Sequence, residues 1–291
     1  MTIQILIILA VMVAAYVAAK AAKLSVELSI FASALAGGVA GAFLKTPPVA
    51  DLGRHLVEGS FTYLDVILVF FTATLFMTIV NESGGVVYVV RATLRVFGGK
   101  RVLALLVLMV IVLIPGALTG AGSVSLLVVG APVAMALGRL GVSRKKTAAI
   151  LFIVAGLSAA APPVNIWAMI LCAGTAIPYV GFEFTLGIPV LILGAFTVLV
   201  LGWKKDPGAA AGPLELPEPP KGMTWWRVLL PFAVFFGLVI AYRAWPFATP
   251  IFGLSLEFAV AGAVALLLSP KKIAFLTLAR DTLKRLLPLL A

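Results

Sequence analysis

Acidic residues, histidine and cysteine are scarce in this sequence. Asp and Glu together account for 11 of 291 residues, and there is one histidine and one cysteine. The single cysteine, Cys172, lies in an apolar stretch and indicates a small packing residue rather than a disulfide framework. We find no metal-ligand spacing, no phosphate-binding glycine loop and no nucleophile–base pair. These absences argue against a metal centre, an ATP-driven pump and an enzyme of ordinary hydrolytic chemistry.

Apolar residues take the place of the missing charge. The chain is 63% hydrophobic and 11% charged, and its mean hydropathy is +1.18. No soluble domain of this length has such a composition. Apolar stretches lie near residues 2–19, 24–44, 61–80, 102–138, 147–180, 184–203, 225–245 and 251–269. The sequence therefore predicts an all-α polytopic membrane protein in the lipid bilayer.

The net charge of +11 comes from Lys and Arg residues in short loops between these stretches. With the N-terminus outside, all of the 22 basic residues except Lys45, Arg54 and Arg243 fall on the cytoplasmic side. This is the positive-inside pattern of membrane proteins. We therefore expect a multi-pass protein of the inner (cytoplasmic) membrane and no nucleic-acid partner.

Residues 102–138 carry no charge and have basic clusters on both sides. Both ends of this segment then lie on the cytoplasmic side, and its middle, residues 114–125, is rich in glycine and serine. Two complete crossings need about 40 residues plus a turn. We expect a re-entrant helical hairpin whose polar tip is buried in protein or lines a cavity. Two full crossings fit the charges equally well.

A repeat indicates how the chain is organised. Residues 24–60 and 251–287 each contain an apolar span, a proline turn and an amphipathic stretch, in opposite predicted orientations. Inverted repeats of this kind are typical of transporters. We expect repeat 1 to begin with scaffold helices and an amphipathic arm (1–60), followed by a transport unit (61–203) that contains the hairpin (102–138) and a broken helix (147–180). A cytoplasmic linker (204–223) then leads to the scaffold helices and arm of an incomplete repeat 2 (224–291). The second half of the site would come from a missing half or another protomer.

The chemistry is expected where the two apolar segments break. Pro162 and Pro163 remove amide donors and force a break, while Gly120 and Gly122 permit an irregular turn at the hairpin tip. Each break offers freed oxygen atoms for a cation and a helix N-terminus for an anion. The expected anion-binding residues are Thr119, Gly120, Ser123, Ser125, Pro163 and Asn165, and the expected Na⁺ ligands are Gly122, Ser123, Ser158 and Ala161. The alternative is that these small residues only allow close helix packing.

Other polar residues carry less information. Asp65, near the start of the span 61–80, is either an ion-coupling acid or simply solvated at the interface. His55 is expected on the surface of an amphipathic helix with Arg54 and Glu58. A membrane-embedded enzyme would need acids, His or Cys facing one cavity, and of the candidates Asp51, His55, Glu58 and Asp65 only the last belongs to a span.

The hairpin tip, residues 116–130, resembles the first hairpin tip of the large membrane subunit of TRAP transporters and of the wider ion-transporter superfamily. Residues 140–144 resemble the turn that follows it, and 156–163 resemble the family's broken helix. The chain departs from the pattern at Ala121 and at Val164-Asn165, where the family commonly has serine. The resemblance covers roughly residues 50–203. It implies an inverted-repeat elevator fold, Na⁺ as the coupling ion, a small membrane subunit and a periplasmic substrate-binding protein as partners.

We therefore expect a secondary active transporter subunit, not an enzyme, that moves a small organic anion such as a dicarboxylate. Na⁺ or H⁺ would drive it, and no other cofactor is expected. A non-transporting scaffold or assembly subunit is the main alternative, followed by a membrane-embedded enzyme.

Overall fold

The described part of the chain is helical throughout. The computed structural model describes residues 2–44, 49–175, 177, 182–206, 216–245 and 253–290, and no strand occurs within these ranges. Among these residues, seven helices are long and apolar enough to cross a bilayer. They are Ile3–Ala21, Val26–Phe43, Gly53–Glu82, Arg101–Thr119, Gly122–Arg139, Phe184–Gly202 and Trp225–Tyr242. The expected class, a multi-pass helical membrane protein, is confirmed.

The chain divides into two compact units, one of residues 1–65 with 283–291 and one of residues 66–282. The described elements are α1 (Thr2–Ala21), α2 (Val26–Phe43), α3 (Val49–Thr62), α4 (Leu64–Glu82), α5 (Gly85–Phe97), α6 (Arg101–Thr119), α7 (Gly122–Ser125), the π-helical η1 (Leu126–Gly130), α8 (Ala131–Arg139), α9 (Arg144–Ala160), α10 (Ile166–Thr175), α11 (Phe182–Gly202), α12 (Trp225–Ala244), α13 (Leu254–Leu268) and α14 (Phe275–Leu290).

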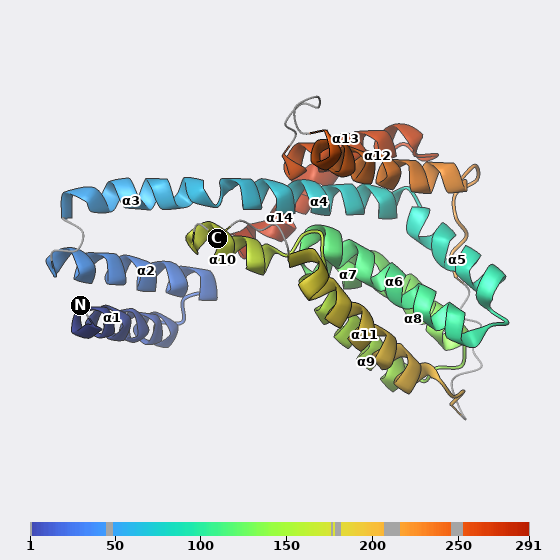
Figure 1. Ribbon diagram of the computed structural model, residues 1–291, viewed down its shortest axis with the longest axis horizontal. Helices are drawn as coiled ribbons and strands as arrows, with labels where there is room; N and C mark the ends of the chain where they lie inside the picture. The colour runs from blue at the N-terminus through green and yellow to red at the C-terminus, as the bar shows by residue number, and fades with distance from the viewer. Residues whose placement is uncertain are drawn as a thin grey trace. The chain divides into compact units, whose positions relative to one another are not determined.

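In the first unit, α1 and α2 form an antiparallel hairpin (Figure 1). Ser25 caps α2, because its hydroxyl accepts a hydrogen bond from the Leu28 amide at 3.3 Å. The Ser33 hydroxyl donates to the Met12 carbonyl of α1 at 2.8 Å. A bond of this kind between two apolar helices satisfies a polar group that lipid could not.

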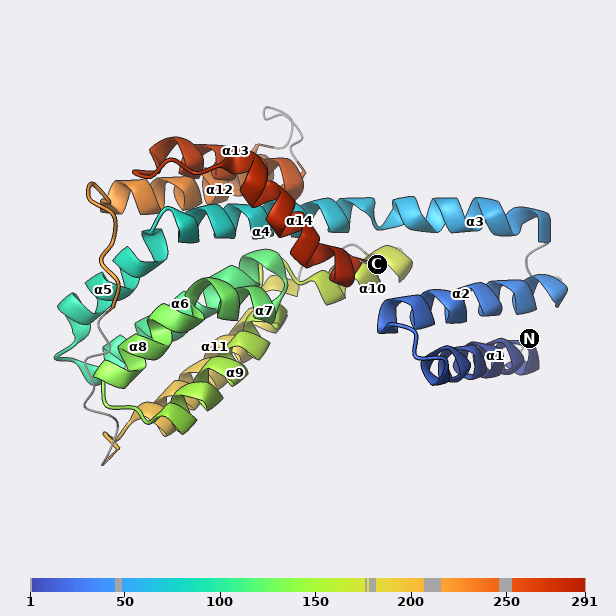
Figure 2. The same cartoon turned by 180° about the vertical axis from the view of Figure 1, so that it is seen from behind.

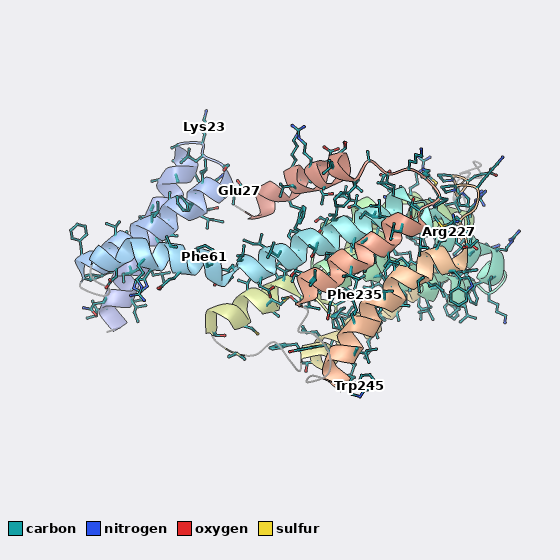
Figure 3. All side chains as sticks on the ribbon, turned by 90° about the horizontal axis from the view of Figure 1, so that it is seen from above. Lys23, Glu27, Phe61, Arg227, Phe235 and Trp245 are labelled. Atoms are coloured by element: carbon teal, nitrogen blue, oxygen red, sulfur yellow. The ribbon has the colours of Figure 1, made fainter. Side chains whose placement is uncertain are left out.

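In the second unit, α12 and α13 lie along α4 (Figure 2). Their contact is aromatic: the rings of Phe76 and Phe232 are 5.1 Å apart, and those of Phe235 and Phe258 stack at 4.2 Å. Figure 3 shows Phe235 between the two ends of α12, which are marked by Arg227 and Trp245. Lipid is as apolar as phenylalanine, so close packing rather than removal from water favours this contact. Each ring pair contributes about 0.5–1.5 kcal/mol.

Elsewhere in the second unit, α6, α8, α9 and α11 form a bundle (Figures 1 and 2). Glycines of α11 allow its close approach to α6. A Cβ added at Gly202 would lie 2.8 Å from Leu105 Cδ2, and one at Gly194 would lie 2.9 Å from Met109 Sδ. The bundle holds both segments that the sequence predicts to break.

The hairpin consists of α6 and a second arm formed by α7, η1 and α8. The arms have 19 and 18 residues and are joined by Gly120-Ala121. At 1.5 Å per residue each arm is about 28 Å long, close to the roughly 30 Å of the hydrocarbon core. The two-residue turn removes the objection that 102–138 is too short for two crossings. The helical hairpin is thus present, and its re-entrance stays a prediction.

Arg101 joins the ends of three elements at one end of this bundle. Its guanidinium donates hydrogen bonds to the carbonyls of Gly202 at 2.8 Å, Lys204 at 3.0 Å and Leu140. Gly202 is the last residue of α11, and Leu140 is the C-cap residue that follows α8. These carbonyls have no partner within their helices and carry the negative end of the helix dipole, which a cation stabilises.

The segment expected as a linker is attached to helices at both described ends. The Asp206 carboxylate lies 2.5 Å from Lys146 Nζ and accepts a hydrogen bond from the Ser143 amide at 2.9 Å. Farther along, Leu216 is 2% exposed, and Pro220 approaches the turn between α4 and α5. A Cβ added at Gly84 would lie 2.3 Å from Pro220 Cδ. Residues 207–215 lie outside the described ranges.

The Asp206 contacts predict a specific pH dependence. The hydrogen bond from Lys146, with that from Ser143, lowers the pKa of Asp206 to about 2. A carboxyl group whose pKa is lower in the folded state stabilises the fold above its unfolded pKa of about 4, and this contribution is lost as the pH falls toward 2. We expect Asp206→Asn to lower the thermal unfolding midpoint at pH 7, and the difference from wild type to vanish near pH 2.

Unfolding in detergent, followed by tryptophan fluorescence at both pH values, measures this effect. Asp281→Asn, at an exposed position on α14, is the matched control and should leave the midpoint unchanged. An equal effect of Asp206→Asn at pH 7 and pH 2 would contradict the role of the ionised carboxylate.

Candidate functional site

The tip of the hairpin is set by Gly120. It ends α6 with a φ of +67°, in the left-handed region that favours glycine. Within the last turn of α6, the Thr119 hydroxyl donates to the Pro115 carbonyl at 2.7 Å and accepts from the Ala121 amide at 3.4 Å. Thr119 is fully buried. Its hydroxyl therefore shapes the turn.

The second break separates α9 from α10, and Asn165 connects its two sides. Its side-chain amide donates to the Ala160 carbonyl, the last residue of α9, at 3.3 Å. Its side-chain oxygen accepts from the Ala168 amide in the first turn of α10 at 3.0 Å. Asn165 thus satisfies an orphan carbonyl and an orphan amide together, as a cap does. The sequence predicts the break from Pro162-Pro163, but not this double contact.

The structure brings the two breaks into contact. The Val164 amide donates to the Ala117 carbonyl of α6 at 3.0 Å. At Gly120, an added Cβ would lie 2.8 Å from the Ile166 backbone nitrogen, where α10 begins. The backbone of the hairpin tip is therefore in direct contact with the backbone of the break between α9 and α10. The sequence prediction that both breaks belong to one region is consistent with this geometry.

Two buried serines extend this contact as a chain of hydrogen bonds. The Ser158 hydroxyl donates to the Ala155 carbonyl at 2.6 Å, and the Ser125 and Ser158 oxygens are 3.1 Å apart. A hydroxyl has one proton, so Ser125 is the donor between them. Ser125 in turn accepts from the Gly116 amide at 2.8 Å. The chain connects both arms of the hairpin to α9.

Ser123 differs from the other predicted ligands. It is exposed at the start of the second arm, and its hydroxyl has no hydrogen-bond partner among the described residues. Gly122 and Pro163 are half-buried, whereas Ala161 is buried. The Ala161 amide donates to the Ser158 carbonyl at 3.2 Å, so that freed carbonyl already has one partner. Ser123 is thus the predicted ligand whose hydroxyl is exposed at the hairpin tip.

The remaining candidates lie in the first unit. Asp65 is the second residue of α4 and is exposed. On α3, His55 Nδ1 lies 3.7 Å from Glu58 Oε2, and Arg54 Nε lies 2.6 Å from Glu58 Oε1. All three side chains are more than half exposed. They form a surface ion-pair cluster on an amphipathic helix.

Sequence reasoning missed Glu257. This acid lies on α13 and is 3% exposed, and its Oε2 has no hydrogen-bond partner among the described residues. The sequence does contain a signal for it, because Glu257 is a single carboxylate in an otherwise apolar segment. An ionisable residue in such a position is a candidate functional residue in a membrane protein. No group of three or more His, Cys, Asp or Glu side chains that could hold a metal ion occurs among the described residues.

Comparisons with protein-family models, with curated proteins and with solved structures find no match to this chain. The class that the fold defines is a multi-pass helical membrane protein whose second unit contains a helical hairpin and a broken helix in direct contact.

Proposed function

We propose that this protein is a secondary active transporter subunit that moves a small organic anion, such as a dicarboxylate, coupled to Na⁺ or H⁺. In this proposal it resembles the large membrane subunit of TRAP transporters. It lies in the inner (cytoplasmic) membrane with its N-terminus outside, and it acts with a small membrane subunit and a periplasmic substrate-binding protein. The hairpin and broken helix move together past scaffold helices in an elevator mechanism.

One observation carries the proposal: two helix breaks from separate segments adjoin each other. Irregular backbone at membrane depth is tolerated only where protein buries it or a cavity hydrates it. Here the tip turn at Gly120 meets the start of α10 at Ile166, and the Val164 amide reaches the Ala117 carbonyl. Discontinuous helices of this kind form ion and substrate sites in many transporters.

The chemistry at the junction suits a small anion together with a cation. The second arm and α10 both begin there, at Gly122 and Ile166, and helix N-termini favour negative charge. Ser123, whose hydroxyl has no hydrogen-bond partner in the described ranges, lies beside the first of these N-termini. A cation would neutralise the charge of the carboxylates and make their transfer across a low-dielectric membrane less costly.

A scaffold or assembly subunit is the second candidate. It is favoured by the chain that runs from Gly116 through Ser125 and Ser158 to Ala155, because these hydroxyls already have protein partners. A purely structural junction needs nothing more than such satisfied contacts. The two candidates differ in what Ser123 does, since its hydroxyl has no part in the chain.

We predict that Ser123→Ala lowers the apparent affinity for substrate by roughly 5- to 150-fold, the effect of losing about 1–3 kcal/mol of hydrogen bonding. The measurement is uptake of radiolabelled dicarboxylates by cells of the source organism in which the gene is deleted and replaced by each variant. Uptake is compared with Na⁺ replaced by choline, and with the proton gradient collapsed by an uncoupler.

Thr72→Ala is the matched control. The Thr72 hydroxyl is satisfied within its own helix, since it donates to the Leu68 carbonyl at 2.8 Å, and its loss should leave uptake unchanged. Uptake that is the same with and without the gene, for every anion in the panel, would refute transport and favour the scaffold. Gene-dependent uptake that Ser123→Ala leaves unaltered would move the site elsewhere.

A further inference from the structure

Glu257 occupies a position that an ionised carboxylate does not tolerate without partners. It lies in the first turn of α13, on the helix face that also buries Phe258, Ala261, Gly262 and Ala265. Only 3% of its surface is exposed, and within the part of the chain that the structure describes no donor forms a hydrogen bond with the enclosed Oε2. Burying an unpaired charge costs far more than burying a neutral group, so such a group neutralises itself instead.

The surroundings of Glu257 are aromatic and aliphatic. The adjacent Phe258 is fully buried, stacks on Phe235 of α12 at 4.2 Å, and lies 6.2 Å from the ring of Phe76 on α4. One turn farther along, α13 also lies against α4, because a Cβ at Gly262 would be in ordinary van der Waals contact with Ile79 Cδ1, at 3.7 Å. This face of α13 is thus enclosed by protein on both the α4 and the α12 sides.

No described cation compensates the carboxylate. None of the ion pairs among the described residues includes Glu257. The helices α4 and α12, which pack against α13, carry the following titratable groups of the second unit: Glu82 on α4, and Arg227, Tyr242 and Arg243 on α12. The following helix, α14, carries the exposed Arg280 and Asp281.

The rise of about 1.5 Å per residue places these groups at some distance, measured along their helix axes, from the level of Phe258. Because Phe235 stacks on Phe258, it marks the level of Phe258 on α12. Arg227 lies eight residues from Phe235, about 12 Å along the axis of α12, and Tyr242 lies seven residues from it, about 10 Å. Glu82 stands six residues from Phe76, about 9 Å along α4. The side chain of Arg243 lies outside the described residues.

We propose that Glu257 is a proton-binding site: its carboxyl group carries a proton in the enclosed conformation and releases it when this face of α13 becomes accessible to water. The exchange is a simple protonation, in which a carboxylate and a proton form a carboxylic acid and nothing else is consumed. A metal cation fits less well, since hard cations need several oxygen ligands. The neighbours on the buried face of α13 are Phe, Ala and Gly.

The proton would couple transport to the proton gradient, and this coupling role rests on the transport function proposed above. The proton-binding site itself does not. For Asp65 the sequence left an ion-coupling role and simple solvation open; the proposal gives the coupling role to Glu257, because Asp65 is exposed whereas Glu257 is enclosed.

The test has a spectroscopic and a transport arm. In the first, the purified protein in lipid nanodiscs is studied by infrared spectroscopy at neutral pH. We expect the wild type to show the carbonyl stretch of a protonated carboxyl group, Glu257→Gln to lack it, and the matched control Glu82→Gln, at an exposed position on α4, to retain it. Glu257→Asp should keep a shifted band. A wild type without the band, or a band that persists in Glu257→Gln, overturns the proposal.

In the second arm, Glu257→Gln replaces the wild type in the cellular uptake assay. We expect accumulation driven by the proton gradient to fall to the level of gene-deleted cells, while exchange of internal for external substrate persists. Unchanged accumulation overturns the coupling role. If the wild type transports nothing, the transport proposal fails, and the infrared arm alone decides whether Glu257 binds a proton.

Discussion

Gly122→Ala will separate the hairpin tip from α9 and lower the thermal unfolding midpoint. The added Cβ would lie 2.2 Å from the Ala155 carbonyl oxygen and 2.9 Å from the Ala155 carbonyl carbon. Backbone atoms cannot turn aside as a side chain can, so one of the two segments has to shift. Overpacking of this kind costs about 1–3 kcal/mol, and occasionally more. Thermal unfolding of the purified protein in detergent measures the change.

The neighbouring glycine of α9 provides the control. A Cβ added at Gly156 meets nothing within 4 Å. Gly156→Ala should therefore leave the midpoint unchanged or raise it, since alanine favours a helix interior over glycine by roughly 0.5–1 kcal/mol. Equal midpoints for Gly122→Ala and Gly156→Ala would show that the tip does not lie against α9 as described.

Arg101→Ala is expected to have the second large effect. It removes the donor that three carbonyls share, those of Gly202, Lys204 and Leu140. Hydrogen bonds from a charged group contribute about 1.5–3 kcal/mol each, and they are not additive because one side chain makes all of them. We expect a loss of at least about 1.5 kcal/mol, measured as a lower unfolding midpoint and as faster proteolysis of the loops at that end of the bundle.

Two variants separate geometry from charge. Arg101→Lys keeps the charge but not the planar fork of donors, so it should fall between wild type and alanine. Arg95→Ala removes an equally basic but exposed residue on α5 and should have little effect. If Arg95→Ala destabilised the protein as much as Arg101→Ala, the effect would come from net charge rather than from the carbonyl contacts.

The sequence predicts the helices well because their signals are local. Long apolar stretches predict α2, α4, α6 and α11, and Pro162-Pro163 marks the break between α9 and α10. Basic loops distinguish a membrane protein from a nucleic-acid-binding one. All of these signals can be read within a few residues, before any tertiary contact is known.

The contacts at the candidate site could not be predicted in the same way. Ser125 and Ser158 are 33 residues apart in sequence, and only the docking of the hairpin on α9 brings their hydroxyls within 3.1 Å. Arg101 was counted among the basic residues that set topology, whereas its role depends on the end of α11 about a hundred residues later. Glu257 escaped notice because one acid barely alters the hydropathy of the segment around it.

The backbone contacts at the tip limit how this junction can change over evolutionary time. Gly116 and Gly122 have no room for a side chain, because an added Cβ would lie 1.9 Å from Ser158 Oγ and 2.2 Å from the Ala155 carbonyl oxygen, respectively. The hydroxyl groups of Ser125 and Ser158 are hydrogen-bonded to each other. Substitutions at the exposed Ser123 therefore need no compensation, whereas substitutions at the surrounding positions require compensating changes on a second helix.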